Sequence, residues 1–473
     1  MEKAEIGLIG LGVMGSNLAL NIAEKGHRIA VFNRTDAAID AFVKRAGDLA
    51  GRIEPCRSLD SLVRSIRAPR PIILMIPAGD PVDQQIEALK PLLDENDILI
   101  DAGNANFHDT VRRMAALSQS GPQFLGVGVS GGEEGARHGP SIMAGGPREA
   151  YDRVEPVLSS IAARFGDEPC SAWVGPGGAG HFVKTIHNGI EYADMQMIAE
   201  IYGIMRDSLR LSPPEMAEIF ATWNKGRLNS YLIEITASVL GVEDAETGGP
   251  LVDVILDRAG QKGTGRWAAI EAQMLAVPAT CIEAAVAARS LSAMKETREE
   301  AQKLFDPASP PPAPEDRTKI LAELEHALLA GKIAAYAQGF AVMAAASRES
   351  GWQLPLATVA RIWRAGCIIR SAFLDEIAKA FDSEGASGNL MLEPEFTAMM
   401  KSAHPALRIT VGRAALAGLP VPALSAALAY FDGFRQARGT ANLIQAQRDF
   451  FGAHGFERID AEGAHHGTWS SGR

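Results

Sequence analysis

A glycine-rich loop near the start of the chain limits the fold most strongly. The loop follows an apolar run at residues 5–10, precedes apolar residues at helical spacing, and consists of Gly10, Leu11, Gly12, Val13, Met14 and Gly15. In a strand–turn–helix unit the first glycine permits the tight turn, the second admits a pyrophosphate, and the third lets the helix pack on the strand. The helix N-terminus then faces the phosphates. We therefore expect a Rossmann-like, dinucleotide-binding domain at the N-terminus.

The next segments alternate strand and helix patterns. Apolar runs at 71–76, 98–101 and 123–129 predict strands, and the segments near 81–93 and 108–119 predict helices. Such alternation favours an α/β doubly wound parallel sheet, whose ligands bind at the carboxyl ends of the strands. The loops expected at these ends carry Met75, Ile76, Pro77, Asn104, Ser130, Gly131 and Gly132. We expect Met75 to Pro77 and Asn104 to contact the cofactor, although each loop taken singly could be a plain connection.

The strand expected at 29–32 ends in Asn33-Arg34-Thr35. NAD enzymes usually place a carboxylate here, on the ribose 2′-hydroxyl. This chain has none, and the planar guanidinium of Arg34 can pair with a 2′-phosphate while Asn33 and Thr35 add hydrogen bonds. The pattern favours NADP over NAD; the alternative is a surface turn with an incidental arginine.

Strand patterns fade after the glycine-rich stretch at 175–178, and long segments rich in Ala, Leu, Ile and Met follow. We expect a nucleotide-binding domain at 1–177, a large all-α domain at 178–435 and a C-terminal tail at 436–473. The proline-rich segment 306–314 predicts a surface loop, with a docking motif as the alternative.

One helix of the second region carries several polar groups on the same face. Lys184, His187, Asn188 and Glu191 follow helical spacing. A base, an acid and two hydrogen-bonding groups would then share one surface, which is enough for proton transfer beside a cofactor. The alternative is the solvated face of an ordinary helix.

Two other basic residues could meet an anion. Lys262 lies in a glycine-bearing polar turn at 261–267, which could approach a phosphate or be a plain loop. Arg289 lies in an alanine-rich helix, where its charge needs an anionic ligand or a nearby carboxylate. His465 and His466 are adjacent, and we interpret them as tail residues rather than metal ligands.

Composition excludes some classes of protein. The 473 residues exceed one ordinary core, and 57 acidic against 46 basic side chains, without a dense basic tract, argue against a nucleic-acid partner. Four scattered cysteines show no metal spacing and suit a reduced cytoplasmic protein. No signal peptide is indicated, and no run looks apolar enough to span a bilayer. We expect no metal and no membrane association.

Several blocks of the chain resemble the decarboxylating 6-phosphogluconate dehydrogenase family, in the same order from Gly10 to the tail. The blocks are Asn-Arg-Thr at 33–35, Val-Ser-Gly-Gly-Glu-Glu-Gly-Ala-Arg at 129–137, His-Asn-Gly-Ile-Glu-Tyr at 187–192, Lys-Gly-Thr-Gly at 262–265, and the segment 441–454. Agreement over so many blocks makes the solvated-face interpretation of the Lys184 helix untenable.

The resemblance implies oxidation of 6-phospho-D-gluconate at C3 with NADP, loss of CO2 and tautomerisation to D-ribulose 5-phosphate, a step of the pentose phosphate pathway. It implies that Lys184 is the general base and that Glu191 protonates C1. The residues implied to bind the sugar acid are Asn104, Ser130, Gly131, Gly132, His187, Asn188 and Tyr192, and those implied around its phosphate are Lys262, Arg289, Arg448 and His454.

In similar enzymes the tail crosses to the partner subunit, so the resemblance also implies a homodimer with shared active sites. The chain departs from familiar relatives at Ala38, at Ile76-Pro77 and at Ala105-Asn106-Phe107. We expect these departures to alter cofactor contacts and the stability of the dimer edge rather than the reaction. The alternatives are a non-decarboxylating β-hydroxyacid dehydrogenase and a catalytically silent NADP-binding protein.

Overall fold

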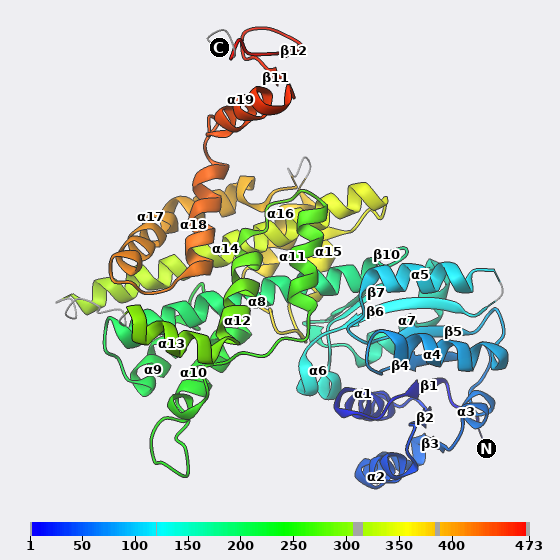
Figure 1. Cartoon of the computed structure of the whole chain (residues 1–473). Coiled ribbons are helices and arrows are strands. Elements are labelled where there is room, and N and C mark those ends of the chain that lie inside the picture. The colour runs from blue at the N-terminus through cyan, green and yellow to red at the C-terminus, as the bar shows by residue number, and fades with distance from the viewer. Residues whose placement is uncertain (1, 120, 306–315, 384–387, 470–473) are drawn as a thin grey trace. The chain divides into compact units, whose positions relative to one another are not determined.

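The structure is a computed structural model that describes residues 2–119, 121–305, 316–383 and 388–469. The chain divides into two compact units, residues 1–427 and 428–473. The first contains an α/β half and a helical half (Figure 1). The proline-rich segment predicted as a loop lies outside the described residues.

The α/β half is built on an eight-stranded sheet. Its strand order is β10-β7-β6-β5-β4-β1-β2-β3. The strands are β1 (Ile6–Ile9), β2 (Ile29–Phe32), β3 (Ile53–Cys56), β4 (Pro71–Leu74), β5 (Ile98–Asp101), β6 (Gln123–Val129), β7 (Ile142–Gly145) and β10 (Ser171–Gly175). The first six strands are parallel, which confirms the predicted doubly wound arrangement.

The sheet is nevertheless mixed, because β7 pairs antiparallel with β6 and parallel with β10. The strands predicted from the sequence all lie in the parallel part of the sheet, whereas β7 and β10 at this edge were not predicted. The loop expected to carry Ser130, Gly131 and Gly132 is short, because α6 (Gly132–His138) begins within it. A second small sheet pairs β8 (Arg164–Phe165) with β9 (Glu168–Pro169).

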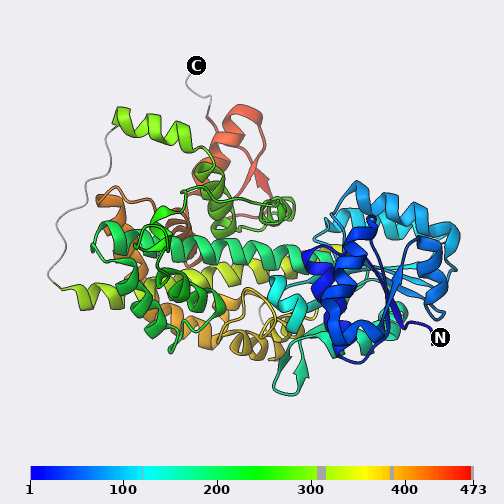
Figure 2. The same cartoon turned by 90° about the horizontal axis from the view of Figure 1, so that it is seen from below.

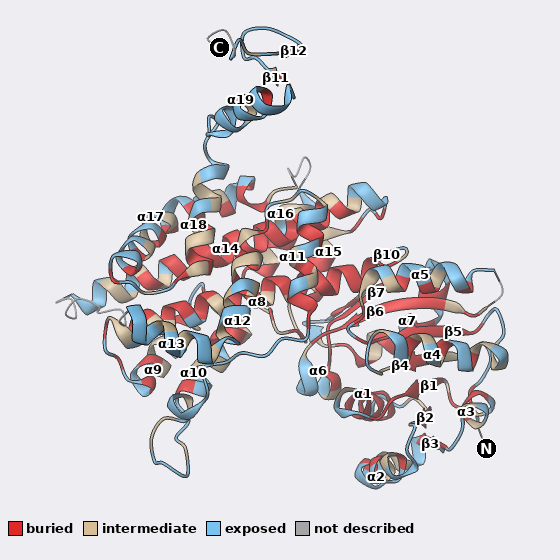
Figure 3. Cartoon of the chain, in the orientation of Figure 1, coloured by how far each residue is buried: buried red, intermediate tan, exposed pale blue. Residues whose placement is uncertain are grey.

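Helices cover both faces of the sheet. They are α1 (Val13–Glu24), α2 (Asp36–Ala46), α3 (Leu59–Ser65), α4 (Asp80–Leu89), α5 (Phe107–Leu117) and α7 (Arg148–Ile161). Alternate side chains of a strand point to opposite faces. Ile6 and Leu8 accordingly join the core under α1 and α7, whereas Ile9 joins the core under α3 and α4. Figure 3 shows these strands buried between helices that expose their outer faces.

Successive strands are added on one side of β1 up to β3 and on its other side from β4 onward, so the strand order reverses between β1 and β4. Gly10 follows β1 with φ +103°, and a side chain there would collide with the carbonyl oxygen of Met75 after β4. Gly15 packs its Cα against the Gly10 carbonyl, whereas the Cβ position of Gly12 faces open space. The three glycines thus allow the turn, the open backbone approach and the close helix packing that a dinucleotide loop needs.

The helical half follows β10. Its helices are α8 (Ala179–Asp207), α9 (Pro213–Trp223), α10 (Tyr231–Leu240), α11 (Thr264–Met274), α12 (Thr280–Ser292), α13 (Lys295–Phe305), α14 (Arg317–Ser350), α15 (Leu356–Ile362), α16 (Leu374–Asp382), α17 (Pro394–Leu416) and α18 (Pro422–Phe434). The two longest, α8 and α14, lie side by side (Figure 2). A buried ion pair links them, with Lys332 Nζ 2.6 Å from Asp194 Oδ1.

Within the described ranges, α14 alone is long and apolar enough to cross a membrane by length and composition. The sequence-based expectation missed it. In the structure, 89% of the most apolar 18-residue stretch of α14 is buried, so α14 is the central core helix of this half.

The boundary between the two units falls within α18, so the second unit contains the end of that helix, α19 (Ala441–Gly452) and a short hairpin of β11 (Phe456–Glu457) and β12 (Ala464–His465). The Asp449 carboxylate organises it. Its Oδ1 accepts hydrogen bonds from Gly455 N (2.9 Å) and His466 Nδ1 (2.7 Å). Its Oδ2 accepts them from Gly467 N (2.8 Å) and Trp469 Nε1 (2.7 Å). These donors hold the pKa of Asp449 well below its ordinary value and fold the tail back on α19.

Candidate active site

Helix α8 begins against the antiparallel edge of the sheet, because glycines leave room for it there. A Cβ on Gly128 of β6 would lie 2.4 Å from Lys184 Cβ, and one on Gly180 would lie 2.3 Å from the Gly126 carbonyl oxygen. The alternate glycines of β6 therefore bring the Lys184 turn of α8 onto the strand that ends at Ser130.

Lys184 is buried, with 6% of its surface exposed. Its Nζ donates a hydrogen bond to Ser130 Oγ at 3.1 Å and lies 3.4 Å from His187 Nδ1. His187 Nε2 lies 3.2 Å from the same Ser130 Oγ. A neutral imidazole protonated on Nε2 satisfies all three contacts, since Nδ1 then accepts from the amine and Nε2 donates to the hydroxyl.

Burial sets the protonation of this cluster. It lowers the pKa of Lys184, an effect that the negative charge of Glu191 opposes. Burial, and then the charge of Lys184, lower the pKa of His187 well below its ordinary value. Since burial disfavours the charged form of a base, a larger fraction of Lys184 is neutral near neutral pH than of an exposed lysine, and only the neutral amine can accept a proton.

Glu191 lies on the same face of α8. Its Oε2 accepts a hydrogen bond from Asn188 Nδ2 at 3.3 Å and lies 3.8 Å from His187 Nδ1. Burial raises its pKa, while the charges of Lys184 and Arg289 oppose the rise. Asn188 Oδ1 is buried and has no hydrogen-bond partner among the described residues, which leaves an acceptor available to a ligand. One helix face thus carries a carboxyl whose pKa is raised and an amine whose pKa is lowered, so both pKa values are shifted toward neutral pH.

Tyr192 joins this face to α11 and α12. Its ring lies beneath the Arg289 guanidinium, 3.7 Å from ring centroid to Cζ. Gly265 lies against the ring, since a Cβ there would come within 2.4 Å of Tyr192 Cδ2. Among the described residues Arg289 therefore stacks on an aromatic ring and forms no ion pair with a carboxylate, which was one of the two partners considered from the sequence. The turn expected over residues 261–267 is in part the start of α11.

Lys262 is exposed and has no hydrogen-bond or ion-pair partner in the described parts of the chain. Arg448 and His454 belong to the second unit and are exposed there. Arg448 Nη1 donates to Gln445 Oε1 at 3.1 Å, and the His454 ring lies 6.1 Å from that of Phe451. These three basic side chains are available to an anion.

The loops expected to bind the nucleotide lie where the strand order reverses, between β1 and β4. Asn33 Oδ1 accepts a hydrogen bond from Leu11 N at 3.0 Å and its Nδ2 donates to Thr35 Oγ1 at 3.1 Å. Asn33 thereby ties the Arg34 turn to the glycine loop. Arg34 is exposed and has no ion pair among the described residues. Met75, Ile76 and Pro77 line the neighbouring loop, and Asn104 is exposed after β5.

No local sequence pattern pointed to the segment after α15, which supports the Ser130 turn. A Cβ on Gly131 would lie 2.6 Å from the Gly366 carbonyl oxygen, and the same oxygen accepts from Ser141 N at 2.8 Å. The Trp363 ring packs edge-on against His187, with centroids 5.4 Å apart. A buried tryptophan followed by a glycine was the available signal, but it is far from Ser130 in the sequence.

In the ranges that the structure describes, no three His, Cys, Asp or Glu side chains converge as metal ligands would. A dinucleotide-type sheet joined to a helix with a buried lysine and a partly buried carboxyl indicates the class of nicotinamide-dependent dehydrogenases.

Comparison with known proteins gives the family. Residues 5–175 match the NAD binding domain of 6-phosphogluconate dehydrogenase, and residues 180–469 match the C-terminal domain of 6-phosphogluconate dehydrogenase. The chain belongs to the 6-phosphogluconate dehydrogenase family.

Relatives and a solved structure agree along the full length. Two decarboxylating 6-phosphogluconate dehydrogenases of Bacillus subtilis are similar: the NADP(+)-dependent one is 49% identical over 99% of this chain and 100% of its own, and the NAD(+)-dependent one is 48% identical over 98% and 99%. The 6-phosphogluconate dehydrogenase of Plasmodium falciparum superposes with a TM-score of 0.95 and 43% identity, covering 98% of this chain and 100% of its own. That enzyme is described with its cofactor NADP+ and with its substrate 6-phosphogluconate. Overall similarity does not separate NADP from NAD, because the two Bacillus enzymes are equally alike.

Proposed function

We propose that this protein catalyses the oxidative decarboxylation of 6-phospho-D-gluconate to D-ribulose 5-phosphate and CO2, with reduction of NADP to NADPH. The observation that carries the proposal is the buried Lys184 amine, in contact with Ser130 and His187 and on the same helix face as Glu191. The family and its full-length relatives support the same reaction.

The residues divide the proton transfers between them. NADP, when bound, supplies the hydride acceptor. Neutral Lys184 accepts the proton of the C3 hydroxyl, and its ammonium form then stabilises negative charge on the C3 oxygen while the carboxylate leaves as CO2. Protonated Glu191 donates its proton to C1 of the enediolate left by the loss of CO2, and the negatively charged oxygen on the neighbouring carbon becomes the ketone. Ser130, His187 and Asn188 orient the sugar acid through their hydrogen-bonding groups.

The fit of the nucleotide to its loops rests on features of this chain. The open Cβ position of Gly12 leaves room for a pyrophosphate, and the N-terminus of α1 follows at Val13. Arg34, which is exposed and has no ion pair in the part of the chain that the structure describes, is the charge that would distinguish a 2′-phosphate from a hydroxyl. We therefore propose NADP rather than NAD as the preferred cofactor.

We further propose that the chain has domains at 1–177 and 178–435 and a tail at 436–473. We propose a cytoplasmic homodimer in which this tail completes the active site of the partner subunit. The proposal rests on the family resemblance. Exposed Arg448 and His454 on a tail folded around Asp449 support it.

The reaction is tested by initial rates of nicotinamide reduction with 6-phosphogluconate, comparing NADP and NAD at matched concentrations and trapping CO2. We expect faster reduction of NADP and one CO2 for each NADPH. Oxidation without CO2 would instead indicate a non-decarboxylating hydroxyacid dehydrogenase. NADP binding without turnover would indicate a silent binding protein.

The cofactor preference is tested by Arg34→Ala. Losing a charge-assisted contact raises the KM for NADP by roughly ten- to a hundredfold and leaves the KM for NAD nearly unchanged. Arg45→Ala is the matched control, because Arg45 is also exposed but lies in the last turn of α2. Equal losses with NADP and NAD in Arg34→Ala would show that Arg34 does not read the 2′-phosphate.

A further inference from the structure

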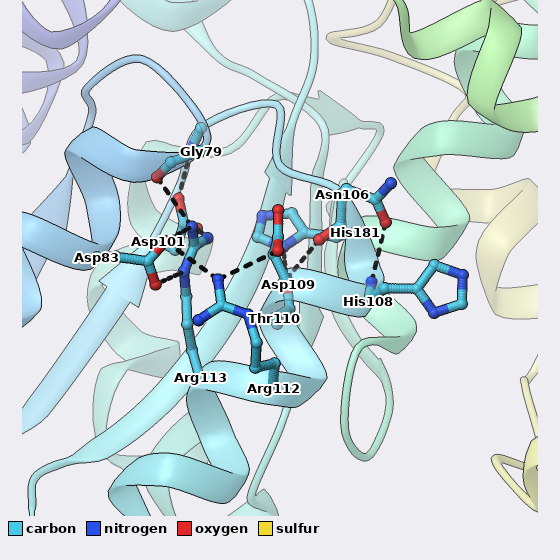
Figure 4. A network of polar contacts seen from close by, with 11 residues as sticks. Gly79, Asp83, Asp101, Asn106, His108, Asp109, Thr110, Arg112, Arg113 and His181 are labelled. Carbon is cyan, nitrogen blue, oxygen red and sulfur yellow. Dashed lines mark hydrogen bonds and ion pairs between the residues drawn. The ribbon is translucent and has the colours of Figure 1, made fainter.

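Arg113 is a buried arginine of α5, outside the α8 cluster, with 2% of its surface exposed. Its guanidinium binds three residues in two other segments, the start of α4 and the end of β5 (Figure 4). Nε and Nη2 donate to Asp83 Oδ1 and Oδ2 at 3.0 and 2.9 Å, Nη2 also donates to the Gly79 carbonyl at 2.9 Å, and Nη1 donates to Asp101 Oδ2 at 3.3 Å. Burying a guanidinium is costly unless every contact is made, so this one holds the segments in a defined geometry.

The Asp101 contact reaches the loop after β5. Asp101 ends β5, is fully buried, and accepts a hydrogen bond from Gly103 N at its Oδ1 (3.1 Å). The next residue is Asn104. The Arg113 guanidinium therefore holds the Asp101 carboxylate in place, and that carboxylate in turn holds the backbone at Gly103, directly before Asn104.

The Gly79 contact reaches the loop after β4. Gly79 precedes α4 with φ +90° and ends the loop that carries Met75, Ile76 and Pro77. The two loops also touch directly, since a Cβ on Gly103 would lie 3.1 Å from the Ile76 carbonyl oxygen. Arg113 thus clasps two loops whose backbones already pack together.

Helix α5 is also joined to α8. Thr110 Oγ1 lies 2.7 Å from His181 Nδ1, one turn before Lys184 (Figure 4). One short helix therefore contacts both nucleotide-side loops and the start of the helix that carries the proposed acid and base.

We propose that Arg113 is a positioning residue, which holds the loops 75–79 and 102–104 in the geometry needed to bind the dinucleotide beside the sugar acid. The inference rests on the proposed function. Arg113 touches neither proposed ligand site and acts through Gly79 and Asp101.

The neighbouring Arg112 provides a matched control. It binds the same carboxylate, with Nη2 3.0 Å from Asp83 Oδ2, and also binds Asp109 at 3.1 Å. Its side chain is 56% exposed and bonds to neither Gly79 nor Asp101 among the described residues. Removing it deletes an ion pair to Asp83 without releasing either loop.

The test compares Arg113→Lys, Arg113→Met and Arg112→Met by NADPH affinity from fluorescence titration, by KM for each substrate, by kcat and by thermal unfolding. Lysine keeps the charge but cannot reproduce the planar set of hydrogen bonds to Asp83, Gly79 and Asp101. We expect Arg113→Lys to weaken NADPH binding and to raise the KM for NADP about tenfold, because small displacements of binding groups are costly. Arg112→Met should keep the parental NADPH affinity and KM values.

A lower Tm with parental NADPH affinity and KM values in Arg113→Lys would mean that Arg113 only stabilises the fold, and would overturn the proposal. If Arg113→Met does not fold, Arg113→Lys and Asp83→Asn decide the question. NADPH affinity is measured without 6-phosphogluconate, so the positioning role can be tested even if the proposed reaction fails.

Discussion

Lys184→Met is expected to lower kcat by about a thousandfold, because it removes both the proton acceptor and the cation beside the C3 oxygen. NADPH affinity should stay near the parental value, since Lys184 does not contact the glycine loop. In the described ranges Lys184 forms no ion pair with a carboxylate, and burial already disfavours its charge. The variant should therefore unfold at a temperature no lower than the parent.

Lys184→Arg separates the roles of base and charge. Arginine keeps a cation at this place but stays protonated at any working pH, so it cannot accept the proton. We expect it to be as inactive as Lys184→Met. Substantial turnover by either variant would contradict the assignment of Lys184 as the base.

The pH profile gives an independent check on Lys184. Activity requires the neutral amine, so kcat/KM falls as the pH decreases through the pKa of Lys184. Because burial lowers that pKa, the fall should begin well below the pH expected for an exposed lysine. A fall centred near the ordinary lysine value would show that burial does not tune this group.

The parts of the site that follow local rules were predictable. The glycine loop and the helix face of Lys184, His187, Asn188 and Glu191 depend on residues close in the sequence, and both form as expected. The strand predicted at 29–32 also forms, and Arg34 lies between its end and the start of α2.

The parts that depend on tertiary packing were not predictable. β7 has four small or apolar residues, and its antiparallel sense follows from the path of the chain after α6, not from its composition. The clasp of Arg113 on Asp101 and Gly79 joins three segments that no local pattern connects. The lowered pKa of Lys184 likewise arises only when β6 and α8 pack together.

The structure also explains how one helix can hold a base and an acid that do not neutralise each other. His187 and Asn188 lie between Lys184 and Glu191 along α8, and both contact Glu191 Oε2. A direct pair would raise the pKa of the lysine and lower that of the carboxyl, which is the opposite of what proton transfer near neutrality requires. Burial lowers the pKa of Lys184 and raises that of Glu191, so both are shifted toward neutral pH. Arg289 stacks on the Tyr192 ring instead of pairing with Glu191.

Glu191→Gln is expected to lower steady-state turnover by about a hundredfold, because glutamine cannot protonate C1. Oxidation and loss of CO2 precede that step, so about one NADPH and one CO2 per active site should form rapidly before the slow phase. Glu191 acts as a protonated acid, so parental activity should fall as the pH rises through its raised pKa, and this limb should disappear in the variant.

Reaction in D2O shows where the C1 proton originates. With Glu191 in place, deuterium should enter C1 of ribulose 5-phosphate with a single stereochemistry, because one positioned acid delivers it. In Glu191→Gln the enediol takes its proton from water and the stereochemistry should be mixed. Glu200→Gln is the matched control: Glu200 is a buried carboxyl of the same helix, but it accepts hydrogen bonds from Ala423 N and Leu424 N at the start of α18. Retained stereochemistry in Glu191→Gln would assign the protonation to another group, whereas mixed stereochemistry in that variant alone identifies Glu191 as the acid.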